Sequence, residues 1–255
     1  MKTKLLAAGI ILAFGAVRLP FEHALTREHQ AAYFHSAEFN LDMRERLGQM
    51  GFVAALSGFR AIIADLLWIQ AHTAWERTEW GRMKLLFDTV TSLQPRAIMF
   101  WDMAAWHMAW NASHAALYDE SQPREALRIK AQREYFRIGE DFLLRGIKNN
   151  PEKPQLYEKL GLIYQTKFND HLKASRAYDE SARRPGAREY AIRFAAFELS
   201  HVPGCEREAY DRLMALYREG EKHHVRTLFT RIAALEEKLS IPPEQRIPQP
   251  REDEP

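Results

Sequence analysis

Residues 154–187 read PQLYEKLGLIYQTKFNDHLKASRAYDESARRPGA, and this stretch predicts the fold. Its large apolar side chains recur three and four positions apart, which is the spacing of one face of an α-helix. The spacing predicts two helices, over residues 154–167 and 171–183. Gly161 and Ala174 have small side chains, so we expect the two helices to cross at close range there. The space around this crossing would be filled by the rings of Tyr157, Tyr164 and Tyr178.

The rest of the body shows the same helical spacing, with no convincing period-2 alternation and no hairpin-turn dipeptide. Prolines mark the connections, because a helix tolerates proline at its start but not in its interior. The helices expected between these breaks cover residues 57–80, 82–93, 97–118, 124–149, 154–167, 171–183, 187–200, 205–219 and 221–239. Helices joined by short turns predict an all-α protein, either a solenoid or a bundle.

A repeat favours the solenoid. The segment quoted above is similar to the tetratricopeptide pattern of about 34 residues, in which an aromatic residue, Leu, Gly and Tyr build the first helix. The matching residues are Tyr157, Leu160, Gly161 and Tyr164, followed by Ala174, Tyr178 and Pro185. Weaker copies precede Pro95, with Leu67, Ala71, Phe87 and Val90, and begin again at Trp101, Ala104 and Ala105, with an insertion around residues 118–128. We therefore expect a tetratricopeptide-like α-solenoid of about four helical hairpins, the last over residues 187–219, closed by a capping helix at 221–239.

Two blocks extend this resemblance to a family. GFRAIIADLLWIQA (residues 58–71) together with WDMAAWHMAWN (residues 101–111) resembles a family of bacterial membrane-anchored tetratricopeptide-like proteins without an established activity. The resemblance covers roughly residues 48–190. It implies a bacterial helical-repeat scaffold and supplies no catalytic residues.

The N-terminus has the character of a membrane segment. Residues 5–17 (LLAAGIILAFGAV) contain no polar side chain and lie between Lys4 and Arg18. Such a run is short for the ~30 Å hydrocarbon layer, but long basic side chains can reach the headgroups. An uncleaved anchor over residues 1–21 is favoured over a cleaved signal peptide and over a buried helix. The flanking charges place the body outside the cytoplasm, on the periplasmic side of a bacterial inner membrane.

The remaining segments follow from this division. Residues 22–56 are expected to be a connecting helical segment, and residues 57–239 the repeat domain. The proline-rich end, residues 240–255, is expected to be a disordered tail, because it offers little material for a core.

Composition favours a binding protein over an enzyme. The 36 basic and 34 acidic side chains give a net charge of +2, so charge alone implies no nucleic-acid partner. The single cysteine, Cys205, excludes an intrachain disulfide and has no setting that would make it reactive. The sequence shows no nucleophile elbow, P-loop or glycine-rich phosphate turn. We therefore expect no catalysis and no cofactor.

The resemblance to tetratricopeptide hairpins implies which residues line a concave groove. Four Trp, two Asp, one His and one Glu fall on such positions, and aromatic anchors with fixed charges are typical of binding hot spots. A basic or proline-containing peptide would suit them through cation–π contacts and charge-assisted hydrogen bonds. The positions are Asp65, Trp68, His72, Trp75 and Glu76 in one helix, and Met99, Asp102, Trp106, Ala109 and Trp110 in the next.

Two alternatives stay open at this point. The tryptophans could be core residues if the repeat register is off by one, with Asp65 bonded to Arg60 or to the backbone. The chain could also bind a metal or haem through His72, Glu76 and His107, although a single His-x-x-x-Glu pair is a common accident.

Overall fold

The computed structural model describes residues 58–248, and this range consists of helices and turns without a β-strand. The all-α class expected from the sequence is therefore confirmed. The chain divides into two compact units, Met1–Pro151 and Glu152–Pro255. The division falls inside the range 57–239 that the sequence assigned to one repeat domain.

The predicted membrane segment, residues 1–21, and the connecting segment, residues 22–56, lie outside the described residues. None of the helices within residues 58–248 is both long enough and apolar enough to cross a bilayer.

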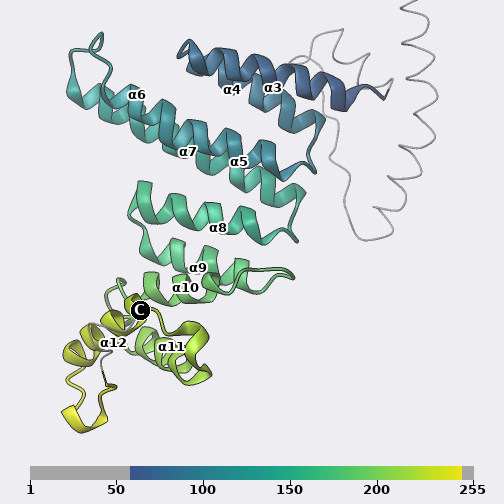
Figure 1. The fold of residues 1–255 in the computed structure, drawn as a ribbon. Helices are drawn as coiled ribbons and strands as arrows, with labels where there is room; N and C mark the ends of the chain where they lie inside the picture. The colour runs from purple at the N-terminus through teal and green to yellow at the C-terminus, as the bar shows by residue number, and fades with distance from the viewer. Residues whose placement is uncertain (1–57, 249–255) are drawn as a thin grey trace, which may run out of the picture. The chain divides into compact units, whose positions relative to one another are not determined.

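In the first unit, the helices form antiparallel pairs joined by short turns (Figure 1). Gly58, with φ +80°, precedes the first of them and adopts a left-handed conformation that glycine tolerates best. The elements are α3 (Arg60–Glu76), α4 (Trp80–Leu93), α5 (Ile98–Trp106), the π-helix η1 (His107–Ala112), α6 (Ser113–Leu117) and α7 (Glu125–Asn149).

The second unit is built in the same way. Pro154 opens its first helix, and Asp170 caps α9 by accepting a 3.0 Å hydrogen bond from the backbone N–H of Lys173. The elements are α8 (Pro154–Ile163), the π-helix η2 (Tyr164–Phe168), α9 (His171–Ala182), α10 (Tyr190–Leu199), α11 (Glu206–Glu219), the 3₁₀ turn η3 (Glu221–His223), α12 (Arg226–Lys238) and the 3₁₀ turn η4 (Pro243–Gln245).

Each unit contains a close helix crossing at a glycine. In the second unit, a Cβ on Gly161 would lie 3.0 Å from ring atoms of Tyr178, so the predicted crossing of α8 and α9 is confirmed. In the first unit, a Cβ on Gly139 of α7 would lie 2.8 Å from the Cβ of Ala109 and 2.9 Å from the carbonyl oxygen of Ala105. The missing side chains let the paired helices approach.

Three of the predicted helices are interrupted. The helix expected over residues 154–167 changes to the π-helix η2 at Tyr164. The helix expected over residues 97–118 contains the π-helix η1, where Gly139 of α7 approaches the backbone. The capping helix expected over residues 221–239 begins only at Arg226, after the turn η3. Gly220, with φ +113°, allows the chain to change direction before that turn.

In the first unit, two ring contacts show how α3 and α5–η1 are related. The ring centroids of Trp68 and Phe100 are 6.0 Å apart, and those of Trp75 and His107 are 5.8 Å apart. Trp75 and His107 follow Trp68 and Phe100 by the same number of residues. The two helices therefore lie side by side and run in the same direction, with α4 as the return between them.

The second unit repeats this relation with polar contacts. The Tyr190 hydroxyl donates to the Glu158 carboxylate, and Gln165 Nε2 donates to Glu198 Oε1 at 2.7 Å. These contacts also advance together along both helices, so α8–η2 and α10 are parallel, with α9 between them. Successive first helices that lie parallel are what a series of similar hairpins produces within a unit.

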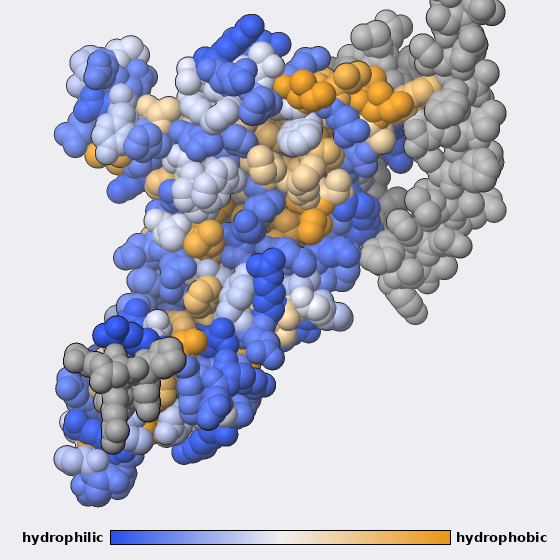
Figure 2. Space-filling view, in the orientation of Figure 1, coloured by the Kyte–Doolittle hydropathy of each residue, from blue (hydrophilic) through white to orange (hydrophobic). Residues whose placement is uncertain are grey.

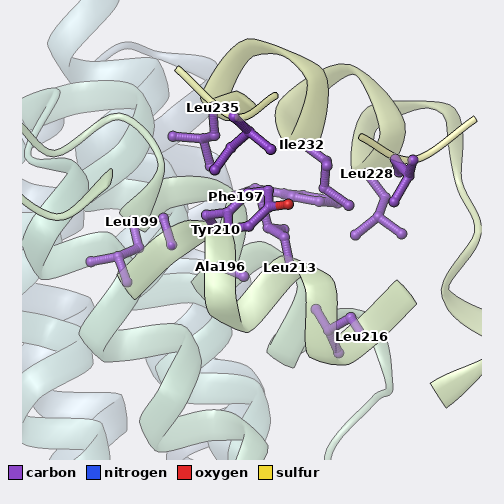
Figure 3. Close-up of a cluster of buried hydrophobic side chains, with 12 residues drawn as sticks. Ala196, Phe197, Leu199, Tyr210, Leu213, Leu216, Leu228, Ile232 and Leu235 are labelled. Atoms are coloured by element: carbon purple, nitrogen blue, oxygen red, sulfur yellow. The ribbon is translucent and has the colours of Figure 1, made fainter. Parts of the chain in front are cut away.

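The C-terminal part of the second unit has a core of its own. Ile241 and Ile247, each 9% exposed, belong to it, and the Ile247 N–H donates to the buried Glu236 carboxylate at 3.0 Å. The prediction of disorder over residues 240–255 is therefore wrong for residues 240–248, because two isoleucines in this proline-rich segment find an apolar surface. Figure 3 shows the cluster they join, which includes Phe197, Tyr210, Leu213, Leu228 and Ile232.

Candidate functional site

The residues predicted to line a groove lie on α3 and on α5–η1, the two parallel helices of the first unit. Most of them reach the surface: Trp75 is 36% exposed and Trp106 is 41% exposed. The charged members on α3 are exposed, and Asp102 and Trp110 are half-buried. We use the name tryptophan surface for Asp65, His72, Trp75 and Glu76 of α3 together with Asp102, Trp106 and Trp110 of α5–η1.

Trp106 and Trp110 form a stacked pair within this surface. Their ring centroids are 4.5 Å apart and their planes differ by 13°. Trp106 ends α5 and Trp110 lies in the π-helix η1, so the change of helix type falls between the two rings. π-helical turns are rare and occur frequently at functional sites, although the second unit also contains one, η2.

The π-helix also explains one error of the sequence analysis. Ala109 was assigned to the groove, yet it is fully buried and faces Gly139 of α7. A π-helical turn contains more residues than an α-helical turn, so positions after His107 are rotated relative to a regular repeat register. Trp110 keeps a partly exposed position beside Trp106.

Trp68 has a different environment from the other predicted groove residues. It is half-buried and packs against the core cluster of Ala64, Val90, Leu93 and Phe100. The alternative of core packing therefore describes Trp68 better than the groove does. It also describes Trp101, which is 3% exposed and donates from Nε1 to the Pro95 carbonyl at 3.0 Å.

A chain of rings leads from the tryptophan surface into the core. The His72 ring stacks on Trp75 at 5.2 Å, Trp75 meets the edge of His107 at 5.8 Å, and His107 stacks on Phe87 at 5.9 Å. Burial, with nearby His72 as a smaller cause, lowers the pKa of His107 to about 4. His107 is therefore neutral at pH 7. The Asn111 side-chain amide donates to its Nδ1 at 2.9 Å, which places the proton on Nε2.

The metal or haem alternative finds little support in this geometry. His72 Nε2 and Glu76 Oε1 are 3.6 Å apart, and both side chains are exposed. His107 is buried, and Asn111 occupies its Nδ1. Across residues 58–248, no three or more His, Cys, Asp or Glu side chains are grouped so that they could hold a metal ion.

The buried carboxylates that connect helices were not predicted from the sequence. In the second unit, Glu198 is 4% exposed and accepts hydrogen bonds from Gln165 and from His171 Nδ1, the latter at 2.8 Å. The His171 ring stacks on His201 at 4.5 Å, and burial, with Arg231 and His171, lowers the pKa of His201. A lone Glu inside the apolar run FAAFEL was the available signal.

The first unit has a comparable carboxylate outside the tryptophan surface. Asp88 of α4 is 3% exposed and bonds Lys84 at 2.8 Å and Arg145 of α7 at 3.0 Å. Burial without partners would be unfavourable for such a group, so these bonds fix α4 against α7.

Compared with protein-family models, with curated proteins and with solved structures, the chain matches none of them. The family resemblance stated from the sequence therefore stays a prediction.

Proposed function

We propose that the protein is a tetratricopeptide-like scaffold or adaptor that binds a protein or peptide partner through the tryptophan surface. The observation that carries the proposal is the exposure of Trp75 and Trp106 on adjacent parallel helices. A soluble protein gains no stability from leaving such rings in water, whereas partly exposed tryptophans are frequent anchors in protein interfaces.

The chemistry of the surface suits a basic, proline-containing peptide. Asp65, Glu76 and Asp102 supply carboxylates on the two helices that carry the rings, and a cationic side chain over a tryptophan gains a cation–π contact. His107, beneath Trp75, is neutral at pH 7 and adds no opposing positive charge. An acidic peptide would meet repulsion from the same carboxylates.

The proposed setting is the periplasmic face of a bacterial inner membrane. Residues 5–17 are apolar enough to enter a bilayer and support a single anchor. A scaffold held there could serve an envelope, secretion or surface-appendage assembly. We propose no catalytic step for it.

Peptide binding to full-length protein in detergent tests the proposal. A labelled peptide of alternating Arg and Pro should bind wild-type protein, measured by fluorescence anisotropy, and a version with Glu in place of Arg should not. Trp75→Ala combined with Trp106→Ala should weaken binding by about 30-fold or more, the effect typical of hot-spot residues.

Ile192→Ala is the matched control, because Ile192 is 43% exposed but belongs to α10 of the second unit. It should leave the affinity unchanged. Equal binding of both peptides, or equal affinity of the double variant and wild type, would show that the tryptophan surface is not the binding site for the basic peptide.

A further inference from the structure

A row of aromatic side chains continues from the tryptophan surface along the helix that carries Trp106. Trp110, His114 and Tyr118 follow Trp106 at intervals of four residues, and residues four apart are neighbours on one face of a helix. The ring centroids of Trp106 and Trp110 are 4.5 Å apart, and those of His114 and Tyr118 are 4.6 Å apart. We use the name ring row for these four residues.

The π-helix η1 keeps the ring row straight. Four residues exceed one turn of an α-helix, so side chains at this interval drift around a regular α-helix. In a π-helix each hydrogen bond spans five residues, so four residues fall short of one turn and the drift is reversed. Trp110 lies inside η1, and His114 follows just after it. The ring row therefore runs nearly parallel to the axis of α5–η1–α6.

The second half of the ring row extends past the end of α3. Trp75, next to the last residue of α3, meets His107 at the start of η1, so the residues after η1 continue beyond that end. Figure 1 shows α6 and its turn into α7 projecting past α3 and α4. His114 is exposed, and Tyr118 is 65% exposed. A partner that lies along α5–η1–α6 can therefore contact Tyr118 as well as Trp106.

Two carboxylates follow the last ring of the row. Asp119 and Glu120 come directly after Tyr118 and are exposed. The Asp119 carboxylate accepts hydrogen bonds from the Ser121 hydroxyl at 2.6 Å and from the Ser121 backbone N–H at 3.0 Å. These bonds lower the pKa of Asp119, and nearby Arg128 lowers it further, so Asp119 is ionised at pH 7. This end of the ring row therefore favours a cationic group.

The dimensions and polarity of the ring row suit an extended peptide. Trp106 and Tyr118 are twelve positions apart, which is roughly 18 Å along a helix. A polyproline II peptide advances about 3.1 Å per residue, so about six residues cover this length. On the face seen in Figure 2, the turn between α6 and α7 is mainly blue and pale, whereas orange atoms gather over α3. Rings beside carboxylates fit a cationic peptide better than a lipid surface.

We propose that the ring row binds a cationic, proline-containing segment of at least about six residues, extended as polyproline II and parallel to α5–η1–α6. Aromatic surfaces bind this conformation because it is preformed and loses little entropy on binding. Asp119 and Glu120 pair with a basic side chain at one end of the segment. The inference rests on the proposed function and adds His114 and Tyr118 to the residues that contact the partner.

Labelled peptides of two lengths test the length of the site. Alternating Arg-Pro peptides of four and eight residues extend over about 12 Å and about 25 Å, so only the longer one reaches from Trp106 to Tyr118. Tyr118→Ala in the full chain should weaken binding of the longer peptide about tenfold and leave the affinity for the shorter one unchanged. Fluorescence anisotropy measures both affinities. Circular dichroism should be unchanged, because the Tyr118 side chain is largely exposed.

The matched control is Leu85→Ala, at a 60% exposed position on α4 outside the ring row, and it should change neither affinity. If Tyr118→Ala binds the longer peptide as wild type does, while Trp75→Ala with Trp106→Ala weakens it, the ring row is overturned and the tryptophan surface stands. An equal loss for both peptides in Tyr118→Ala would also overturn the ring row. Absence of binding of either peptide to wild type would overturn both proposals.

A charge variant tests the end of the ring row separately. Asp119→Asn with Glu120→Gln should weaken binding of the longer peptide about threefold, the effect of exposed charge pairs. Glu237→Gln with Glu244→Gln removes the same number of exposed carboxylates from the second unit and should leave the affinity unchanged. Equal losses in the two double variants would show that only net charge attracts the peptide, and would overturn the role of Asp119 and Glu120.

Discussion

The two units use the same helix arrangement with opposite chemistry at the interface between their first helices. In the first unit, this interface is aromatic, with Trp75 against His107, and Trp75 remains 36% exposed. In the second unit, it is polar, with Glu158 and Glu198 only 6% and 4% exposed and bonded to partners on the neighbouring helices. In the polar interface, the carboxylates bond to side chains of the same unit. In the aromatic interface, part of the Trp75 ring stays exposed, where the proposed partner could contact it.

This difference predicts different responses to mutation. A buried carboxylate must keep its partners, because an unpaired polar group in the interior is costly. The removal of an exposed ring has little effect on folding and lowers only the affinity for a partner.

The largest contrast is expected within one helix. Trp101 is 3% exposed and Trp106 is 41% exposed, and both belong to α5. Trp101→Ala should lower the free energy of unfolding by about 4 kcal/mol, the range for large-to-small changes in a core. Trp106→Ala should lower it by less than about 1 kcal/mol. Urea unfolding followed by circular dichroism measures both, and equal losses would mean that Trp106 is a core residue.

The next effect comes from overpacking a helix crossing at a glycine, a feature that each unit contains. Gly161→Leu forces a side chain against the Tyr178 ring and should lower the free energy of unfolding by about 3 kcal/mol. Gly81→Ala is the matched control, because no heavy atom lies within 4 Å of its added Cβ, and it should stabilise α4 by about 0.5 kcal/mol. An unchanged melting curve for Gly161→Leu would refute the close crossing.

Removal of a carboxylate from the polar interface should have a smaller effect. Glu198→Ala leaves Gln165 and His171 without their acceptor and should lower the free energy of unfolding by about 2 kcal/mol. Glu76→Ala, at an exposed carboxylate on α3, should change it by less than about 0.5 kcal/mol. Similar losses of unfolding free energy for the two variants would show that the buried Glu198 stabilises the fold no more than an exposed carboxylate does.

The smallest effect concerns pH and the aromatic interface. The folded pKa of His107 is about 4, below its usual 6.5, so between these values the unfolded chain binds a proton that the folded chain does not. The stabilisation is complete above pH 6.5 and is lost as the pH falls toward 4. From about pH 7 to pH 5.5, wild type should lose about 1 kcal/mol more stability than His107→Phe.

Urea midpoints at the two pH values measure this difference. His107→Phe keeps a ring between Trp75 and Phe87 but does not titrate. Identical pH dependence in wild type and variant would show that His107 is protonated as easily in the folded protein as in the unfolded chain.

The features that the sequence predicts well are those encoded locally. Prolines and glycines mark the helix ends, and the small residue Gly161 marks a crossing, because each constrains the backbone or the space at its own position. Trp75 and Trp106 are exposed, and both fall on positions that the resemblance to tetratricopeptide hairpins assigned to the groove.

The features that escaped prediction depend on residues far away in the sequence. The π-helix His107–Ala112 coincides with the close approach of Gly139, and the burial of Glu158 depends on Tyr190. The packing of Ile241 and Ile247 was hidden by the proline-rich composition around them. The spacing of apolar residues along the sequence does not show which distant residues contact one another in the fold.

We expect the partner to contact the exposed tryptophans of the first unit. The chain has six tryptophans, so its indole N–H signals in a ¹⁵N-labelled sample can be assigned by single substitutions. Titration with the Arg- and Pro-containing peptide should shift the signals of Trp75, Trp106 and Trp110 and leave the buried Trp101 signal in place. Saturation without any indole shift, or a shift confined to Trp101, would show that the peptide does not bind at the tryptophan surface.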